Sequence, residues 1–128
     1  MRCLDSSFLI DLVRGTPAAV RKARALEASK EQLSMTAPAM TEVLRGAYYR
    51  GGQELRDTLE MLAGLDILEV DEDVAAEAGR MGAELLRRGM EMGAVDLMIA
   101  AAAKLSGHIL VTRDSSFFGI PDLAVESY

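Results

Sequence analysis

Cysteine, histidine and tryptophan are scarce in this chain of 128 residues, which contains one cysteine, one histidine and no tryptophan. The single cysteine, Cys3, excludes an internal disulfide framework and the zinc sites that are built from several cysteines. No nucleophile motif lies near the single histidine, His108, so it is interpreted as a loop residue rather than a catalytic base. The chemistry of this protein therefore has to rest on other side chains.

Long apolar runs and glycine-rich loops are missing as well. Asp5 and Asp11 interrupt the apolar N-terminal stretch, so neither a signal peptide nor a membrane span is expected, and a cytoplasmic location is the default. Gly79, Gly82 and Gly89 are too widely dispersed to form a nucleotide-binding fingerprint.

Positive charge is in the minority, with 14 Lys and Arg against 20 Asp and Glu and a formal net charge of −6. This balance argues against a protein that binds nucleic acid through its overall electric field. Eleven of the 14 basic residues are arginine, the side chain that contacts phosphate through two parallel hydrogen bonds. A local basic patch beside an acidic site is therefore compatible with the composition.

The length and the hydrophobic content of 50% predict a single domain over residues 1–128. Apolar strand patterns alternate with helical patterns along the whole chain, which favours an α/β fold with a parallel sheet covered by helices on both faces. The expected strands cover the N-terminal residues up to Leu4 and residues 32–36, 67–70, 109–112 and 123–125. The expected helices cover residues 6–13, 18–29, 38–47, 54–63, 72–88 and 96–105.

Four acidic residues stand where these elements begin or end: Asp5 after the first strand, Glu42 and Asp96 early in helices, and Asp114 after a late strand. Each one alone has an ordinary explanation as a helix cap, a partner of the helix dipole or a turn residue. Together they would repel one another and would need a cation to stay ionised. Carboxylate ligands of this kind suit Mg²⁺ or Mn²⁺.

Four segments, residues 4–11, 41–43, 96–103 and 110–117, resemble the successive motifs of PIN domains, in the order and with the separations of that family. The short single-domain form resembles VapC toxins of toxin–antitoxin pairs. The resemblance implies a three-layer α/β/α sandwich with a mainly parallel sheet of about five strands. It also implies a Mg²⁺- or Mn²⁺-dependent endoribonuclease that leaves a 5′-phosphate and a 3′-hydroxyl.

The resemblance carries Asp5, Glu42, Asp96 and Asp114 over as the catalytic, metal-binding acids. Asp5 and Asp96 are expected to bind the metal directly, Glu42 directly or through water, and Asp114 to orient the attacking water or help hold a second ion. Two hydroxyls are implied as supporting residues: Ser6 beside the first acid, and Thr112 before the last. Many relatives carry one more acid at the place of Ser116, and its replacement here favours a single firmly held ion.

The resemblance also implies three partners, namely an RNA substrate, a second copy of the chain and a VapB-type antitoxin. Arg113, Arg45 and Arg50 are the expected RNA contacts. Asp11 is interpreted either as an outer member of the site or as an exposed helix acid. Tyr48 and Tyr49 are assigned to packing or to a dimer contact rather than to base stacking. The antitoxin groove is expected along seven apolar residues: Phe8, Leu9, Val13, Leu26, Met40, Leu44 and Tyr48.

Two other classes remain as alternatives. A receiver-like signalling domain also has a parallel sheet and an Asp–Mg²⁺ site, but it needs an acidic pair at the end of the first strand, where Asp5 is followed by two serines. It also needs a lysine near a later strand end, whereas Lys104 lies inside an expected helix. A PIN-like binding module without catalysis is disfavoured because all four acids are present.

Overall fold

A computed structural model describes all 128 residues and places five short parallel strands in one sheet. The spatial order is β3-β2-β1-β4-β5, with β1 at the centre and every neighbouring pair parallel. The sheet therefore has the topology expected from the alternating pattern. The strands are β1 (Arg2–Leu4), β2 (Leu33–Thr36), β3 (Asp66–Leu68), β4 (Ile109–Val111) and β5 (Val125–Glu126).

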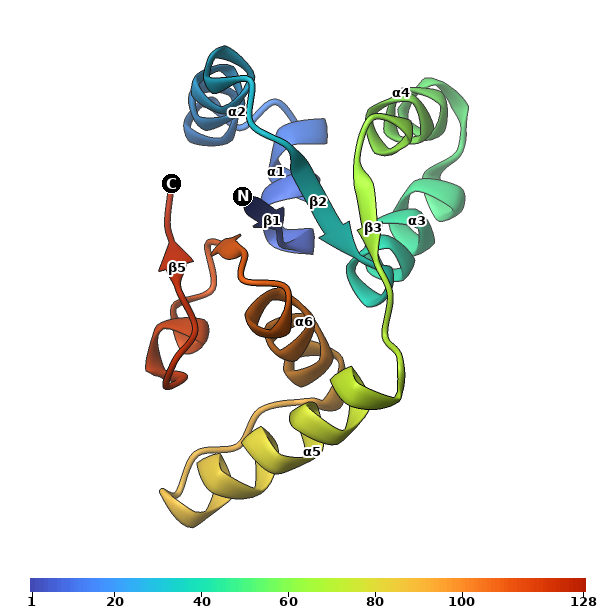
Figure 1. Cartoon of the computed structure of the whole chain (residues 1–128). Coiled ribbons are helices and arrows are strands. Elements are labelled where there is room, and N and C mark those ends of the chain that lie inside the picture. Colours follow the sequence, from blue (N-terminus) through green and yellow to red (C-terminus); the bar gives the residue numbers. More distant parts are fainter.

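Helices cover both faces of this sheet (Figure 1). On one face α1, α2 and α4 pack together, on the other α5 packs on α6, and α3 contacts both α1 and α6 at the end of β2. The three-layer α/β/α prediction is therefore confirmed. The helices are α1 (Ser6–Val13), α2 (Pro17–Ser29), α3 (Ala37–Arg50), α4 (Gly52–Ala63), α5 (Glu72–Arg87), α6 (Ala94–Leu105) and the 3₁₀ helix η1 (Ser115–Gly119).

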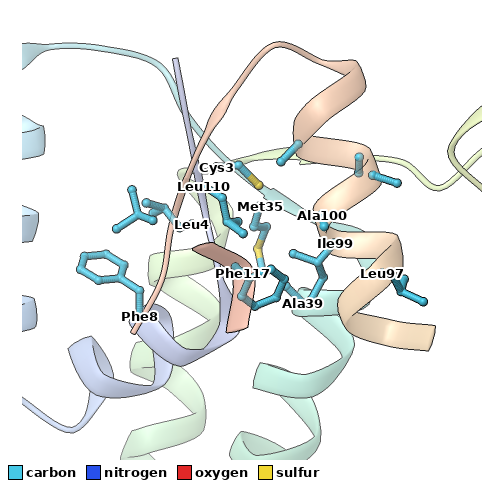
Figure 2. Packing of buried hydrophobic residues seen from close by; sticks show 14 of the residues in the cluster. Cys3, Leu4, Phe8, Met35, Ala39, Leu97, Ile99, Ala100, Leu110 and Phe117 are labelled. Atoms are coloured by element: carbon cyan, nitrogen blue, oxygen red, sulfur yellow. The ribbon is translucent and has the colours of Figure 1, made fainter. Parts of the chain in front are cut away.

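The core lies between the sheet and these helices (Figure 2). Cys3, Met35 and Leu110, from three adjacent strands, are fully buried, and so is Ile99 of α6. The four consecutive alanines of α6, residues 100–103, are at most 1% exposed. Because their side chains are small, α6 can lie close to the sheet, and this position carries Asp96 at the start of α6 toward the strand ends.

Some element boundaries differ from the sequence prediction. β5 begins at Val125 rather than Leu123, and β3 covers Asp66–Leu68 rather than residues 67–70. Both strands lie at the edges of the sheet, where pairing on only one side fixes the ends weakly and where the apolar pattern is short. The N-cap of α1 is Asp5, not Ser6 or Ser7, and its side chain makes no capping hydrogen bond. That carboxylate is therefore free for other contacts.

The turn after β4 contains an element that the sequence pattern did not predict. Residues 115–119 form η1, which places Phe117 in the core at 1% exposure, while Phe118 is 53% exposed. Figure 2 shows Phe117 among Met35, Ala39 and Ile99. A 3₁₀ helix of five residues is too short to show a helical repeat of apolar residues in the sequence. It becomes evident only in the structure, where Phe117 packs in the core.

No helix of the structure combines the length and the apolar character that crossing a membrane requires.

Replacing Phe117 with alanine should lower the free energy of unfolding by about 3–5 kcal/mol, because a buried ring is lost and a cavity remains. Phe118→Ala is the matched control, since Phe118 is largely exposed, and should change it by no more than about 0.5 kcal/mol. Urea denaturation followed by circular dichroism measures both. Equal effects of the two substitutions would contradict the packing role of η1.

Candidate active site

Asp5 lies at the carboxyl end of the central strand, where the chain leaves β1 and begins α1. β1 pairs with β2 on one side and with β4 on the other, so this edge is the switch point at which ligands bind in open α/β sheets. The Asp5 side chain is buried, and its Oδ2 atom accepts hydrogen bonds of 2.8 Å from both Ser7 and Thr112. Its Oδ1 atom is buried without any hydrogen-bond partner.

The predicted position of the first hydroxyl was wrong by one residue. Ser6 does not bond Asp5; its hydroxyl donates instead to Oε1 of Glu42 at 2.9 Å, and Ser7 supports Asp5. Successive residues of a helix turn by about 100°, so neighbouring serines in the first turn point in different directions. Ser6 therefore faces α3, whereas Ser7 faces β4. Both hydroxyls hold a carboxylate of the site.

Thr112 connects the first acid to the last, in agreement with the sequence prediction. Its buried hydroxyl donates to Asp5 and accepts a hydrogen bond of 3.0 Å from the backbone N–H of Asp114. The Ser7 oxygen lies 3.2 Å from the Thr112 oxygen and accepts a hydrogen bond from the backbone N–H of Arg113. These contacts fix the turn after β4 against the start of α1.

Asp114 is exposed, and its Oδ1 atom accepts hydrogen bonds from the backbone N–H of Ser116 at 2.9 Å and from the Ser116 hydroxyl at 2.7 Å. Ser116 occupies the place where a further acid was considered. Its hydroxyl holds Asp114 in one orientation and adds no negative charge to the site.

Asp96 lies in the electric field of the other three acids. Partial burial and the negative charges of Asp5, Glu42 and Asp114 raise the pKa of Asp96 from 3.8 to about 6. Desolvation is the larger cause, and the three charges act in the same direction. All four predicted acids therefore share one electrostatic environment at the carboxyl edge of the sheet.

The four carboxylates do not form a ready metal-binding cluster, since no three His, Cys, Asp or Glu side chains are arranged to hold a metal ion together. Mutual repulsion explains a spread arrangement of four like charges. The donor chemistry nevertheless fits a hard divalent cation, because every candidate ligand is a carboxylate oxygen and one of them, Asp5 Oδ1, is buried without a partner.

The three predicted RNA-contact arginines lie in different settings. Arg113 is next to Asp114, and its guanidinium donates to Asp11 at 3.0 Å. Arg45 is exposed and lines a groove of about 530 Å³ that also contains Glu42. Arg50 is at the other end of α3, where it is paired with Glu54. Proximity to the acids therefore favours Arg113 and Arg45 over Arg50.

Size alone does not locate the site. The largest hollow, of about 940 Å³, lies between β3, α5 and the end of α6, and none of the four acids lines it. The groove of about 530 Å³ is smaller, and one of the four acids, Glu42, lines it together with Val95 and Met98 of α6.

Asp11 belongs to a buried cluster and is not an exposed helix acid. Only 3% of Asp11 is exposed, and its Oδ2 atom accepts a 2.6 Å hydrogen bond from the hydroxyl of Tyr128. Tyr128 was not singled out in the sequence at all. A signal for Asp11 was present, since it follows Phe8 by three residues and so lies on the buried face of α1.

The apolar residues expected to form the antitoxin groove are not all at the surface. Phe8, Leu9 and Leu26 are at most 4% exposed, but all three line a hollow of about 300 Å³ between α1, α2 and α4, so the antitoxin groove stays a prediction. Apolar residues of a groove and of a core look alike in a sequence. Tyr48 and Tyr49 are 62% and 91% exposed, which excludes packing within the protomer as their role. His108 lies in the turn before β4, as predicted, although it is buried there.

This chain is similar to known proteins along most of its length. Residues 2–123 match the model of the PIN domain family. A protein of Shigella flexneri named tRNA(fMet)-specific endonuclease VapC is 30% identical over 119 residues, which cover 90% of this chain and 87% of that protein.

Two solved structures are similar over almost the whole chain. The DNA-bound VapBC structure from Salmonella typhimurium has a TM-score of 0.83 and 26% identity, and covers 99% of this chain and 98% of that chain. The FitAcB structure from Neisseria gonorrhoeae has a TM-score of 0.83 and 28% identity, and covers 98% of this chain and 96% of that chain.

A match to the PIN domain family along almost the whole chain disfavours the receiver-like alternative. The strand order, the four acids at the carboxyl edge and these similarities agree, and the chain belongs to the PIN domain family, in its VapC group.

Proposed function

We propose that this protein is a Mg²⁺- or Mn²⁺-dependent endoribonuclease and the toxin of a VapBC-type pair. The observation that carries the proposal is the state of Asp5: two hydroxyls hold one oxygen, while the other oxygen is buried and unpaired. The charge of Asp5 also acts on Asp96, as do those of Glu42 and Asp114. A buried oxygen of this kind is costly unless a cation or a donor binds it. Membership of the VapC group supports the same activity.

Asp5 and Asp96 are the proposed direct ligands, Glu42 binds directly or through water, and Asp114 orients the attacking water. A divalent ion held by these carboxylates supplies charge neutralisation and an acidified water for phosphodiester hydrolysis. Ser7 and Thr112 fix the orientation of Asp5, and Ser6 that of Glu42. Because Ser116 adds no charge beside Asp114, one ion rather than two is proposed.

The substrate proposal follows the relatives. The Shigella and Salmonella proteins are named for cleavage of tRNA(fMet), so initiator tRNA is the first substrate to test. Arg113 and Arg45 would contact its phosphates, with Arg50 a more distant contact.

The partner proposal has two parts. A VapB-type antitoxin is proposed because the similar Salmonella structure is a VapBC complex. A cationic antitoxin side chain would satisfy the carboxylates and compete with the metal. A homodimer is proposed because Tyr48 and Tyr49 are exposed on α3, and aromatic residues are enriched at such interfaces. Action inside the cytoplasm is part of the same proposal.

The Asp5→Asn variant should fold but cut initiator tRNA more than about 100-fold more slowly at saturating Mg²⁺. Changing a residue that only supports a metal ligand already costs about 10–100-fold. Gel analysis of the cleaved tRNA measures the rate, and circular dichroism checks the fold. Glu60→Gln, which removes an exposed charge on α4, is the control. Undiminished cleavage by Asp5→Asn would refute the proposed site.

Asp96→Asn should stabilise the metal-free protein at pH 7.5. The folded-state pKa of about 6 lies above the ordinary 3.8, so ionisation of Asp96 makes folding less favourable as the pH rises through this interval. Removing the charge should raise the free energy of unfolding by about 1 kcal/mol, after a discount for solvent screening.

The gain should shrink as the pH falls from 6 toward 4, where wild-type Asp96 is protonated. Urea titrations in EDTA at several pH values measure it, again with Glu60→Gln as the control. Added Mg²⁺ should stabilise the wild type, and Asp96→Asn much less. A pH-independent gain would contradict the raised pKa.

A further inference from the structure

Asp11 is a buried carboxylate of α1 with both oxygens occupied. Oδ1 accepts from Arg113 Nη1 at 3.0 Å, and Oδ2 accepts from the Tyr128 hydroxyl at 2.6 Å. The Asp11 side chain is 5% exposed, whereas that of Arg113 is 62% exposed. A buried carboxylate is costly without such partners. Asp11 therefore acts as a buried anchor for a guanidinium that remains open to solvent.

Most of the donors of Arg113 remain available. A guanidinium carries five N–H groups, and the side chain of Arg113 makes one hydrogen bond, to Asp11. The backbone of Arg113 is fixed separately, because its N–H donates to the Ser7 hydroxyl that also supports Asp5. A cation is thus held immediately before Asp114, with several donors unpaired and 62% of its side chain exposed.

Tyr128 fixes the other side of the anchor. Its ring packs edge to face on Phe8 at a centroid distance of 4.9 Å. Burial and the nearby Asp11 raise the pKa of Tyr128, so its hydroxyl stays protonated and donates. The strand that leads to it is held by ion pairs of Glu126 with Arg2 and Lys22. Asp11 is therefore held by two residues near the C-terminus, which follow it by 102 and 117 positions in the sequence.

We propose that Asp11, held by Tyr128, is a positioning residue that aims Arg113 at an RNA phosphate beside the scissile bond. An untethered arginine next to four carboxylates would turn toward them and neutralise the site. Anchored to Asp11, the guanidinium is kept for the substrate, and its donors are preorganised for two hydrogen bonds to one phosphate. The inference rests on the proposed endoribonuclease function and adds to it the residues that place the cation.

A double-mutant cycle on the full chain tests this inference. Asp11→Asn and Arg113→Ala should each raise the KM for initiator tRNA about 10-fold with little change in kcat. In the Arg113→Ala background, Asp11→Asn should raise the KM by less than about a further twofold. The effects of two residues that act through one another are not additive. Tyr128→Phe, which keeps the ring on Phe8, should give a smaller increase of the same kind. Arg87→Ala, at an exposed arginine of α5 without an ion pair, is the control.

The salt dependence of RNA binding in EDTA supplies a readout that a purely structural role would not move. Losing one phosphate contact lowers the slope of log K against log salt by about 0.7–0.9. Asp11→Asn and Arg113→Ala should each lower this slope by that amount, and the double variant should show the same slope as either single variant. If Asp11→Asn does not fold, the cycle is run with Tyr128→Phe.

The outcomes separate the two proposals. Additive effects of Asp11→Asn and Arg113→Ala, or an unchanged salt slope, would overturn the positioning role even if the wild type cuts RNA. Coupled effects on binding without any cleavage in Mg²⁺ or Mn²⁺ would support the positioning role and refute the endoribonuclease.

Discussion

Repulsion among four carboxylates is the constraint on which the rest of this site depends. The parallel strands bring Asp5 and Asp114 to one edge, and two helix starts bring Glu42 and Asp96 to the same place. Since the acids repel one another, hydroxyl donors hold three of them, Asp5, Glu42 and Asp114, in fixed orientations. Ser6, Ser7, Thr112 and Ser116 each donate to one of them. The site is therefore an arrangement of hydroxyls as much as of acids.

Short strands are enough to build this arrangement. Strands of two to four residues are sufficient because each ends at the edge where a functional residue is needed. The small side chains of α6 let that helix approach the sheet, and Phe117 of η1 closes the core beneath the last acid. The turn after β4 thus contains both a core residue, Phe117, and a residue of the site, Asp114. A change in packing at Phe117 should therefore move Asp114.

The sequence predicted most of the fold and the four acids, because both depend on local patterns. Strand ends and helix starts depend on a few neighbouring residues, as at Asp71, whose carboxylate accepts a hydrogen bond from the backbone N–H of Val74 at the start of α5. The prediction failed where the direction of one of two successive helix residues matters, at Ser6 and Ser7, and where contacts join residues far apart in the sequence. Asp11 and Tyr128 are 117 residues apart in sequence, and no local pattern pairs them. Core and groove residues also look alike in a sequence, so the low exposure of Phe8 and Leu26 was not predicted.

The four consecutive buried alanines of α6 have a genetic consequence. Any larger side chain there would push α6 away from the sheet and move Asp96 with it, since a packed interior cannot absorb extra volume. Loss-of-function substitutions should therefore occur at these four alanines as well as at the four acids. A selection for cells that escape toxicity would then yield variants that change the spacing between α6 and the sheet, in addition to variants that lack a carboxylate.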